Sequence, residues 1–332
     1  KDTAAAIAKE LNMINDESEA ITGAELDKIS DEDFVSQVDK YSVYARVSPE
    51  HKVRIVKAWK ANGKVVAMTG DGVNDAPALK VSDIGVGMGI TGTDVAKGVS
   101  DMVLSDDNFA TIVEAVKEGR TIFSNIRKSI QFLLSANMGE VITLFVATML
   151  NWNILLPIHI LWVNLVTDAL PALALGVEKP EKDVMKKKPR KSQGNFFAGG
   201  LGISVIYQGF IEGLITLGTY YIGSRLFSDE VAVTMTFATL GLIQLTHSFN
   251  VRSDKKSIFE IGLFSNKYQI GAVLLSTFMQ LIVIFVPQLN KLFKVVPLNP
   301  VQWLIVACAS LLIIPLVEIV KLIQAHRAGA EA

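Results

Sequence analysis

Cysteine is nearly absent from the 332 residues, since Cys308 is the only one. A disulfide within the chain and a metal site built from several thiolates are therefore excluded. An excess of charge is absent as well, because 32 Lys and Arg residues stand against 33 Asp and Glu residues and the net charge is −1. This balance gives no reason to expect nucleic acid as a partner.

A start methionine and a secretory signal peptide are also missing from the beginning of the sequence. The first residues, Lys1–Leu11, already lie within a helical pattern of apolar positions. We therefore expect a fragment or a processed piece of a longer protein.

Long apolar runs are abundant, and they are confined to the second part of the chain. Residues 1–127 hold most of the acidic side chains and resemble a soluble α/β domain in composition. The remainder contains six runs of roughly 20 apolar residues, the length that spans a bilayer. The runs are Ile130–Leu150, Ile154–Leu175, Phe196–Ile222, Val231–Phe249, Tyr268–Val286 and Val301–Ile323. We predict an all-α membrane domain of six helices, in contact with membrane lipid.

Basic residues gather in two of the loops between these runs and predict the orientation of the chain. Glu178–Ser192 and Arg252–Lys267 are rich in lysine and arginine, whereas Asn151–Asn153 and Gly223–Glu230 are short and hold only Arg225. The basic residues of the first loop are Lys179, Lys182, Lys186, Lys187, Lys188, Arg190 and Lys191. By the positive-inside rule, we expect residues 1–127 and the carboxyl terminus to be cytosolic. We expect the membrane to be the cell (plasma) membrane.

One long helix is predicted to join the soluble part to the membrane. Thr111–Arg127 is charged with a helical pattern, and it runs directly into the apolar Ile130–Leu150. We expect a soluble domain over residues 1–109, a stalk helix over residues 110–129 and a membrane domain over residues 130–325.

The soluble part alternates short apolar strands with helices, a pattern that predicts a doubly wound parallel sheet. Strands are expected over Val43–Val47, Val65–Met68, Ile84–Val86 and Met102–Leu104. Helices are expected over Thr3–Leu11, with Thr3 as its cap, and over Gly23–Lys28, Asp31–Val38, Pro49–Ala61 with Ser48 as its cap, Asp75–Lys80 and Thr93–Lys97. Ligands of such sheets lie at the carboxyl ends of the strands, where Asp71 is placed.

Two glycine-bearing motifs compete for a ligand in this domain. Gly87–Gly92 fits the dinucleotide fingerprint GxGxxG, but that signal is weak and glycines after a strand more often serve a tight turn. Thr69–Asp75 offers Asp71, Asn74 and Asp75 on a turn that contains Thr69, Gly70 and Gly72, and such oxygens suit Mg²⁺ with phosphate. Asp75 could instead serve only as a helix cap, and Lys52 could either reach the phosphate or remain a solvated surface lysine.

Polar residues inside the apolar runs predict a second site, because an ionisable side chain at the bilayer centre costs roughly 3 kcal/mol or more. Asn137 and Glu140 share one helix face, and so do Asn164, Thr167 and Asp168 on the next helix. These oxygens suit Ca²⁺, with its six to eight ligands. Hydrogen bonding between helices is the alternative, but it does not explain two acids.

Proline and two further acids complete the set of notable residues in the membrane part. Pro171 is expected to break the helix beside Asp168 and to free backbone carbonyls there. Glu318 is expected to pair with Lys321 on a helix surface. Glu212, near Gly209 and Gly213, suggests close helix packing around a protonated acid, with a proton path as the lesser alternative.

The stretch Met68–Leu79 (MTGDGVNDAPAL) resembles the hinge motif of P-type ATPases, and the likeness continues through Ser105–Phe109 and the membrane helices, closest to the calcium-pump branch. The resemblance implies a haloacid-dehalogenase-like phosphorylation domain, ATP as energy source and six membrane helices numbered five to ten in the family. It also implies Asp71 as a Mg²⁺ ligand, Asn74 and Asp75 as supports of the phosphorylated site, and Lys52 as a contact of the phosphoryl group.

The sequence departs from the family pattern in two ways. The Asp-Lys-Thr-Gly motif of the phosphorylated aspartate is absent, so we expect this chain to be inactive without the missing amino-terminal part of the same pump. Gln244–Asn250 has no acid where two-ion pumps carry a glutamate, which predicts a single Ca²⁺. Another cation, such as Mn²⁺ or Na⁺, and a non-catalytic membrane regulator remain alternatives.

Overall fold

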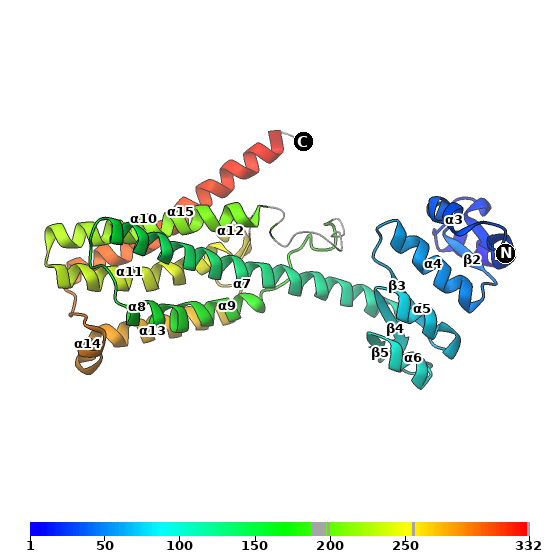
Figure 1. The fold of residues 1–332 in the computed structure, drawn as a ribbon, viewed down its shortest axis with the longest axis horizontal. Coiled ribbons are helices and arrows are strands. Elements are labelled where there is room, and N and C mark those ends of the chain that lie inside the picture. The colour runs from blue at the N-terminus through cyan, green and yellow to red at the C-terminus, as the bar shows by residue number, and fades with distance from the viewer. Residues whose placement is uncertain (188–196, 198–199, 254–255, 331–332) are drawn as a thin grey trace. The chain divides into compact units, whose positions relative to one another are not determined.

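The computed structural model describes residues 1–187, 197, 200–253 and 256–330, shown in Figure 1. The described residues form two compact units, which are considered separately below. The first contains Lys1–Val116, and the second contains Lys117–Lys186 and the described residues from Phe197 on. Lys188, Arg190 and Lys191 of the predicted basic loop lie outside the described residues, as does the beginning of the predicted run Phe196–Ile222.

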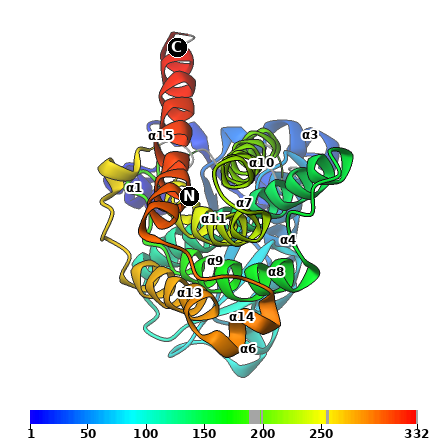
Figure 2. The same cartoon turned by 90° about the vertical axis from the view of Figure 1, so that its left-hand side faces the viewer.

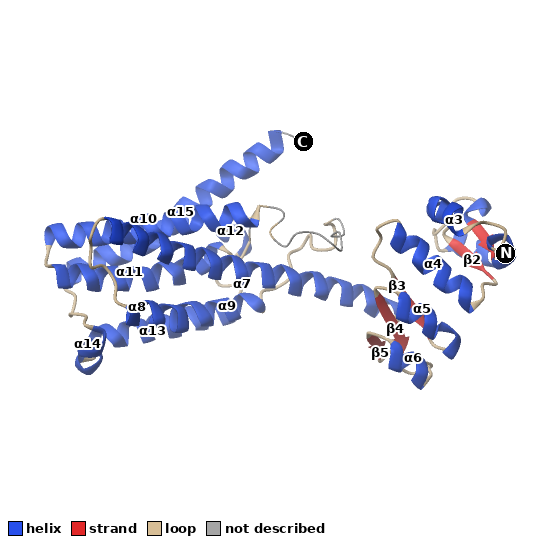
Figure 3. Cartoon of the chain, viewed as in Figure 1, coloured by secondary structure: helices blue, strands red, loops and turns tan. Residues whose placement is uncertain are grey.

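The first unit contains two small parallel sheets with helices between their strands, as Figure 3 shows in red and blue. Its helices are α1 (Asp2–Glu10), α2 (Gly23–Leu26), α3 (Asp31–Gln37), α4 (Pro49–Ala61), α5 (Ala76–Val81) and α6 (Asp94–Val99), with short 3₁₀ turns at Glu17–Glu19, Val38–Lys40 and Val73–Asp75. Its strands are β1 (Ala20–Thr22), β2 (Val43–Ala45), β3 (Ala67–Gly70), β4 (Ile84–Met88) and β5 (Met102–Leu104).

The parallel pairing confirms the predicted α/β class, with strand order β1-β2 in one sheet and β3-β4-β5 in the other. Met68 pairs with Gly85 and Gly87 pairs with Val103, so the carboxyl ends of β3, β4 and β5 meet at one edge. The loops after β3 and β4 therefore leave the sheet side by side.

Local side-chain chemistry explains where helices begin, although one predicted cap is wrong. Ser48 and His51 form the reciprocal pair of bonds that starts α4, with Pro49 at its first position, as predicted. Thr3 does not cap α1, because that helix begins at Asp2, whose acidic side chain suits the positive end of the helix dipole.

The second unit is helical, and six of its helices are long and apolar enough to span a membrane, as predicted. The first of its helices, α7 (Phe109–Met149), begins within the first unit and continues into the second. The other elements are α8 (Pro157–Trp162), the π-helical segment η4 (Val163–Asp168), α9 (Ala169–Gly176), α10 (Leu201–Leu226), α11 (Asp229–Asn250), α12 (Ile258–Ile261), α13 (Lys267–Phe285), α14 (Pro287–Phe293) and α15 (Pro300–Ala330). The prediction of one continuous helix from the charged stretch into the apolar run is confirmed, since α7 has 41 residues.

Helix α11 forms the centre of the bundle, with 78% of its most apolar stretch buried. It packs against α9, α10, α13 and α15, and Figure 2 shows it surrounded by these helices. Small residues bring α7 and α10 together beside it. A Cβ atom added to Gly209 would lie 2.6 Å from the Cβ of Met138, and one added to Gly139 would lie 3.0 Å from that of Glu212. The predicted close helix packing around the glycines is confirmed.

We expect Gly209→Val to destabilise the bundle by roughly 1–3 kcal/mol, because the added atoms overlap α7 and force the two helices apart. Gly218→Val, on the same helix, is the matched control, since a Cβ there meets nothing within 4 Å. The midpoint of thermal unfolding in detergent would measure both. Equal midpoints for the two variants would contradict tight packing at Gly209.

Candidate functional site

The loop after β3 is organised around the buried side chain of Asp75. Its carboxylate Oδ2 accepts hydrogen bonds from the N–H groups of Asp71 and Gly72, each at 3.3 Å. Gly70 allows this fold, because an added Cβ would lie 2.4 Å from the Cβ of Asp75. Asp75 directly precedes α5 but makes no side-chain capping bond to it, so the reading of Asp75 as a helix cap is wrong. Its side chain turns back to close the loop.

Lys52, in the first turn of α4, lies beside the same carboxylate. Its ammonium Nζ donates to Asp75 Oδ1 at 2.5 Å, so the alternative of a free surface lysine is wrong. Burial alone would raise the pKa of Asp75, but the Lys52 ammonium and the N–H groups of Gly72 and Asp71 hold that pKa below its ordinary value. The ion pair therefore persists at neutral pH.

Asp71 and Asn74 flank this ion pair and are both exposed. Within the described part of the chain their side chains make no hydrogen bond, whereas Asp75 is occupied by Lys52. An exposed carboxylate with free oxygens beside a cation-paired one fits Mg²⁺, which takes one or two protein carboxylates and fills its shell with water and phosphate oxygens. Thr69, the last but one residue of β3, is half-buried.

The competing motif, Gly87–Gly92, has three consecutive backbone donors already occupied. The carboxylate of Asp107 accepts from the N–H groups of Gly89, Ile90 and Thr91 at 2.6, 3.0 and 2.8 Å. A dinucleotide phosphate would have to displace this side chain. The glycines therefore serve a tight turn, as the less specific interpretation of the motif predicted.

In the second unit, residues of three helices meet around Glu140 of α7. Its carboxylate accepts from the Asn164 amide at 2.8 Å and from the Gln244 amide at 3.2 Å. Thr167 donates to the other end of the Gln244 amide at 3.3 Å. Gln244 is not among the predicted site residues, because its neutral side chain gives no charge signal in the sequence. Its two hydrogen bonds show that it belongs to the cluster.

Asp168 is the least satisfied member of this cluster. Its side chain is fully buried, and neither carboxylate oxygen has a hydrogen-bond partner among the described residues. It lies close enough to Glu140 for their charges to interact. Buried polar atoms are normally hydrogen-bonded, so two free carboxylate oxygens beside a second acid indicate a place for a cation.

The helix next to Asp168 widens instead of breaking. Val163–Asp168 is a π-helix, and Pro171 lies buried inside the following α9. The predicted break at Pro171 is therefore wrong. Proline lacks an N–H for the carbonyl four residues earlier and its ring crowds that carbonyl, and a wider turn relieves both problems without ending the helix.

Two family models match the chain. The model described as "Cation transporting ATPase, C-terminus" matches residues 152–323, and the one described as "haloacid dehalogenase-like hydrolase" matches residues 1–83. The chain belongs to the cation-transporting ATPase family.

Curated relatives are similar to this chain over almost its whole length. "Calcium-transporting ATPase 1" of Bacillus cereus is 52% identical, over 97% of this chain and 38% of its own length. "Calcium-transporting ATPase" of Bacillus subtilis is 50% identical, over 92% of this chain and 34% of its own length. The human "Calcium-transporting ATPase type 2C member 1" is 39% identical, over 98% of this chain and 36% of its own length. The chain thus spans little more than a third of the length of these relatives.

Asn137 is not brought to the cluster around Glu140. Its side chain is exposed on α7 and its amide donates to the Leu133 carbonyl at 2.7 Å. Of the predicted ligands, the structure brings together Glu140, Asn164, Thr167 and Asp168. Gln244 joins them, and the role of Asn137 remains a prediction. Among the described residues, no three His, Cys, Asp or Glu side chains cluster as a metal site by themselves.

Two other acids of the membrane part make no hydrogen bond to the cluster. Glu318 pairs with Lys321 at 3.0 Å, as predicted, but both side chains are buried and Lys321 also donates to the Asn250 carbonyl. The prediction of a surface pair is wrong, because α15 packs this face against α11. Glu212 is fully buried, and neither of its carboxylate oxygens has a hydrogen-bond partner among the described residues, although His247 Nε2 lies 3.5 Å away. Its protonation remains a prediction.

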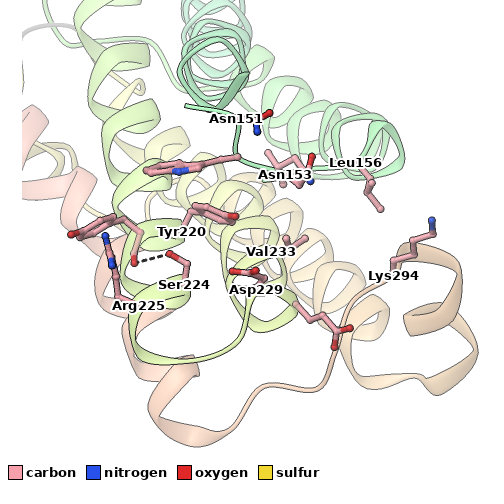
Figure 4. A pocket seen from close by; sticks show the side chains of 13 residues that line it. Asn151, Asn153, Leu156, Tyr220, Ser224, Arg225, Asp229, Val233 and Lys294 are labelled. Atoms are coloured by element: carbon pink, nitrogen blue, oxygen red, sulfur yellow. Dashed lines mark hydrogen bonds between the residues drawn. The ribbon is translucent and has the colours of Figure 1, made fainter. Parts of the chain in front are cut away.

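A cavity of about 710 Å³ opens where the loop after α7 meets the α10–α11 turn (Figure 4). Trp152, Tyr220, Arg225, Asp229 and Lys294 are among its lining residues. None of the residues of the Glu140 cluster lines it, so it is separate from the candidate cation site.

Proposed function

We propose that this chain is the carboxyl-terminal part of an ATP-driven calcium pump that works through an aspartyl-phosphate intermediate. The carrying observation is Asp168, buried with two unpartnered oxygens beside Glu140, Asn164, Thr167 and Gln244. The names of the relatives favour Ca²⁺ over Mn²⁺ and Na⁺. They also favour a pump over a non-catalytic regulator.

The loop around Asp75 would serve the phosphorylation chemistry. Asp71 would hold Mg²⁺, which neutralises charge on the phosphoryl group when bound. Asp75 fixes Lys52 and closes the loop, so that the lysine ammonium is held at the same place as a point charge. Asn74 and the loop of Thr69, Gly70 and Gly72 would support the phosphorylated aspartate, which belongs to the preceding part of the pump together with the ATP-binding domain.

The cluster around Glu140 would bind the transported ion. Oxygen atoms of two carboxylates, two amides and a hydroxyl form a hard site suited to Ca²⁺. The Asn164 and Gln244 amides donate their N–H groups to Glu140, so each would turn its oxygen toward the ion to become a ligand. Ion binding would therefore exchange hydrogen bonds for metal contacts within the same residues.

The topology follows from the same proposal. The protein would lie in the plasma membrane, with residues 1–127 and the carboxyl terminus on the cytosolic side. It would consist of a phosphorylation-domain segment over residues 1–109, a stalk over residues 110–129 and a membrane domain over residues 130–325. The basic loops support this orientation. The continuity of α7 supports the stalk, because one helix extends from Phe109 to Met149.

Substitution of the Mg²⁺ ligand tests the phosphorylation half of the proposal. In the complete pump, we expect Asp71→Asn to abolish Mg²⁺-dependent phosphorylation while leaving Ca²⁺ binding nearly intact, because the lost charge belongs to the phosphate loop. Asp94→Asn, an exposed acid at the start of α6, is the control. Radiolabelled ATP would report the phosphoenzyme, and its formation at the wild-type level in Asp71→Asn would refute the assignment.

A further inference from the structure

The carboxylate of Asp107, a half-buried residue, accepts an unusually large number of hydrogen bonds. Asp107 lies in the turn between β5 and α7 with a left-handed backbone, φ +49°. Besides the three N–H groups of Gly89, Ile90 and Thr91, it accepts from the Thr91 hydroxyl at 2.8 Å. One side chain thus holds three consecutive residues of the loop after β4.

This loop is folded so tightly that it forms a concave row of backbone donors. A Cβ added to Gly89 would lie 2.3 Å from the Leu104 carbonyl oxygen, and one added to Gly92 would lie 2.0 Å from that of Met88. Such rows of N–H groups bind anions, and here the anion is a side chain of the same chain. The N–H group of Ile90, with those of Thr91 and Gly89, lowers the pKa of Asp107 to about 2 despite the opposing effect of desolvation.

The residues joined by the Asp107 contact are connected to the phosphate loop on one side and to α7 on the other. On one side, the N–H of Thr93, just beyond the loop, donates to the Asp71 carbonyl at 2.8 Å. On the other side, Asp107 is two residues from α7, whose first turn is fixed by Asp106 through the Thr111 hydroxyl at 2.7 Å. Asp107 therefore closes a path from the phosphate loop to the beginning of α7.

We propose that Asp107 is a positioning residue that fastens the first turn of α7 to the loop bonded to Asp71, so that phosphorylation and cation binding bias each other through this helix. The inference rests on the proposed function. Coupling between distant sites needs a physical element whose position both sites influence, and α7 carries Glu140 on its membrane part. A loose fastening would leave each site competent but weaken the effect of one on the other.

The test uses the complete pump with Asp107→Asn and Asp107→Ala. The asparagine keeps one acceptor oxygen and loses the charge, and the alanine loses every bond. Asp101→Asn is the matched control, because Asp101 also accepts a backbone N–H, that of Gly85 at 2.8 Å, but at the beginning of β4 and not in the loop that follows this strand. Each variant is phosphorylated with radiolabelled inorganic phosphate without Ca²⁺, Ca²⁺ is then titrated in, and Ca²⁺ binding is measured separately with the isotope.

We expect phosphorylation and Ca²⁺ binding to survive in Asp107→Asn, while the Ca²⁺ concentration that suppresses phosphorylation rises roughly tenfold. Asp101→Asn should match the wild type. A merely structural role would lower phosphorylation and binding together and leave the suppressing concentration unchanged, and that result overturns the inference. If Asp107→Ala fails to fold, the result for Asp107→Asn alone tests the inference. If the wild-type pump shows neither phosphorylation nor Ca²⁺ binding, the proposed function itself has failed.

Discussion

ATP hydrolysis should no longer depend on Ca²⁺ in a pump that carries Ile122→Pro. Ile122 lies in the first half of α7, between the beginning of the helix and Glu140. Proline there removes one backbone hydrogen bond and clashes with the preceding turn, which costs roughly 3 kcal/mol in a helix interior. Because Ile122 is half exposed, the substitution should break the helix with little effect on the core of the bundle.

Ile122→Ala separates the loss of helix continuity from the loss of the side chain, since alanine is the best helix former. We expect that variant to keep Ca²⁺-stimulated hydrolysis and the proline variant to insert in membranes with an unstimulated, residual rate. The measurement is ATP hydrolysis with and without Ca²⁺ on equal amounts of inserted protein. Persistent stimulation in Ile122→Pro would show that coupling does not pass through a continuous α7.

Features set by local sequence were predictable. Each apolar run has roughly the 20 residues that a helix needs to span a bilayer. Among the described residues, six helices are long and apolar enough to do so. The start of α4 was readable because Ser48, Pro49 and His51 act within one turn. The strands after Gly63 are approximately placed, although β3 begins two residues later than expected, at Ala67.

Features set by packing were not predictable from spacing. Asn137 and Glu140 are three residues apart, yet only Glu140 faces the bundle, because the neighbours of α7 decide which part of its polar side is covered. The contact of Asp107 joins residues 16 to 18 positions apart, which no local pattern reveals. Gln244 was missed because a neutral amide gives no charge signal, although its two-ended group bonds both Glu140 and Thr167.

The widening beside Asp168 shows how one local rule was outweighed. Pro171 favours a broken helix, but a true break would leave backbone groups unbonded among buried side chains. The π-helical turn keeps the chain helical and places Thr167 and Asp168 on its buried side. Widened turns of this kind are frequent at functional sites, which agrees with the proposed ion site.

One Ca²⁺ per phosphorylated pump is the expected stoichiometry. Stripping a divalent cation of water requires anionic oxygen, and the acids of the cluster are Glu140 and Asp168. By family resemblance, one more acid from the missing fourth helix would complete this same site. By the same resemblance, the stretch Gln244–Asn250 has no acid where two-ion pumps carry a glutamate, and Gln244 itself is bonded to Glu140 and Thr167.

Asp168→Asn should therefore remove high-affinity binding altogether. The variant keeps the shape of the side chain but loses half of the acidic charge of the cluster. We expect Ca²⁺ affinity to fall by roughly 100-fold or more, since even residues behind the direct ligands cost roughly 10- to 100-fold. Glu230→Gln, an exposed acid at the start of α11, should bind as the wild type does. Isotope binding at saturating Ca²⁺ decides the number, and two ions per phosphorylatable pump would mean that Glu212, Thr246 or Asn250 contributes to a second site.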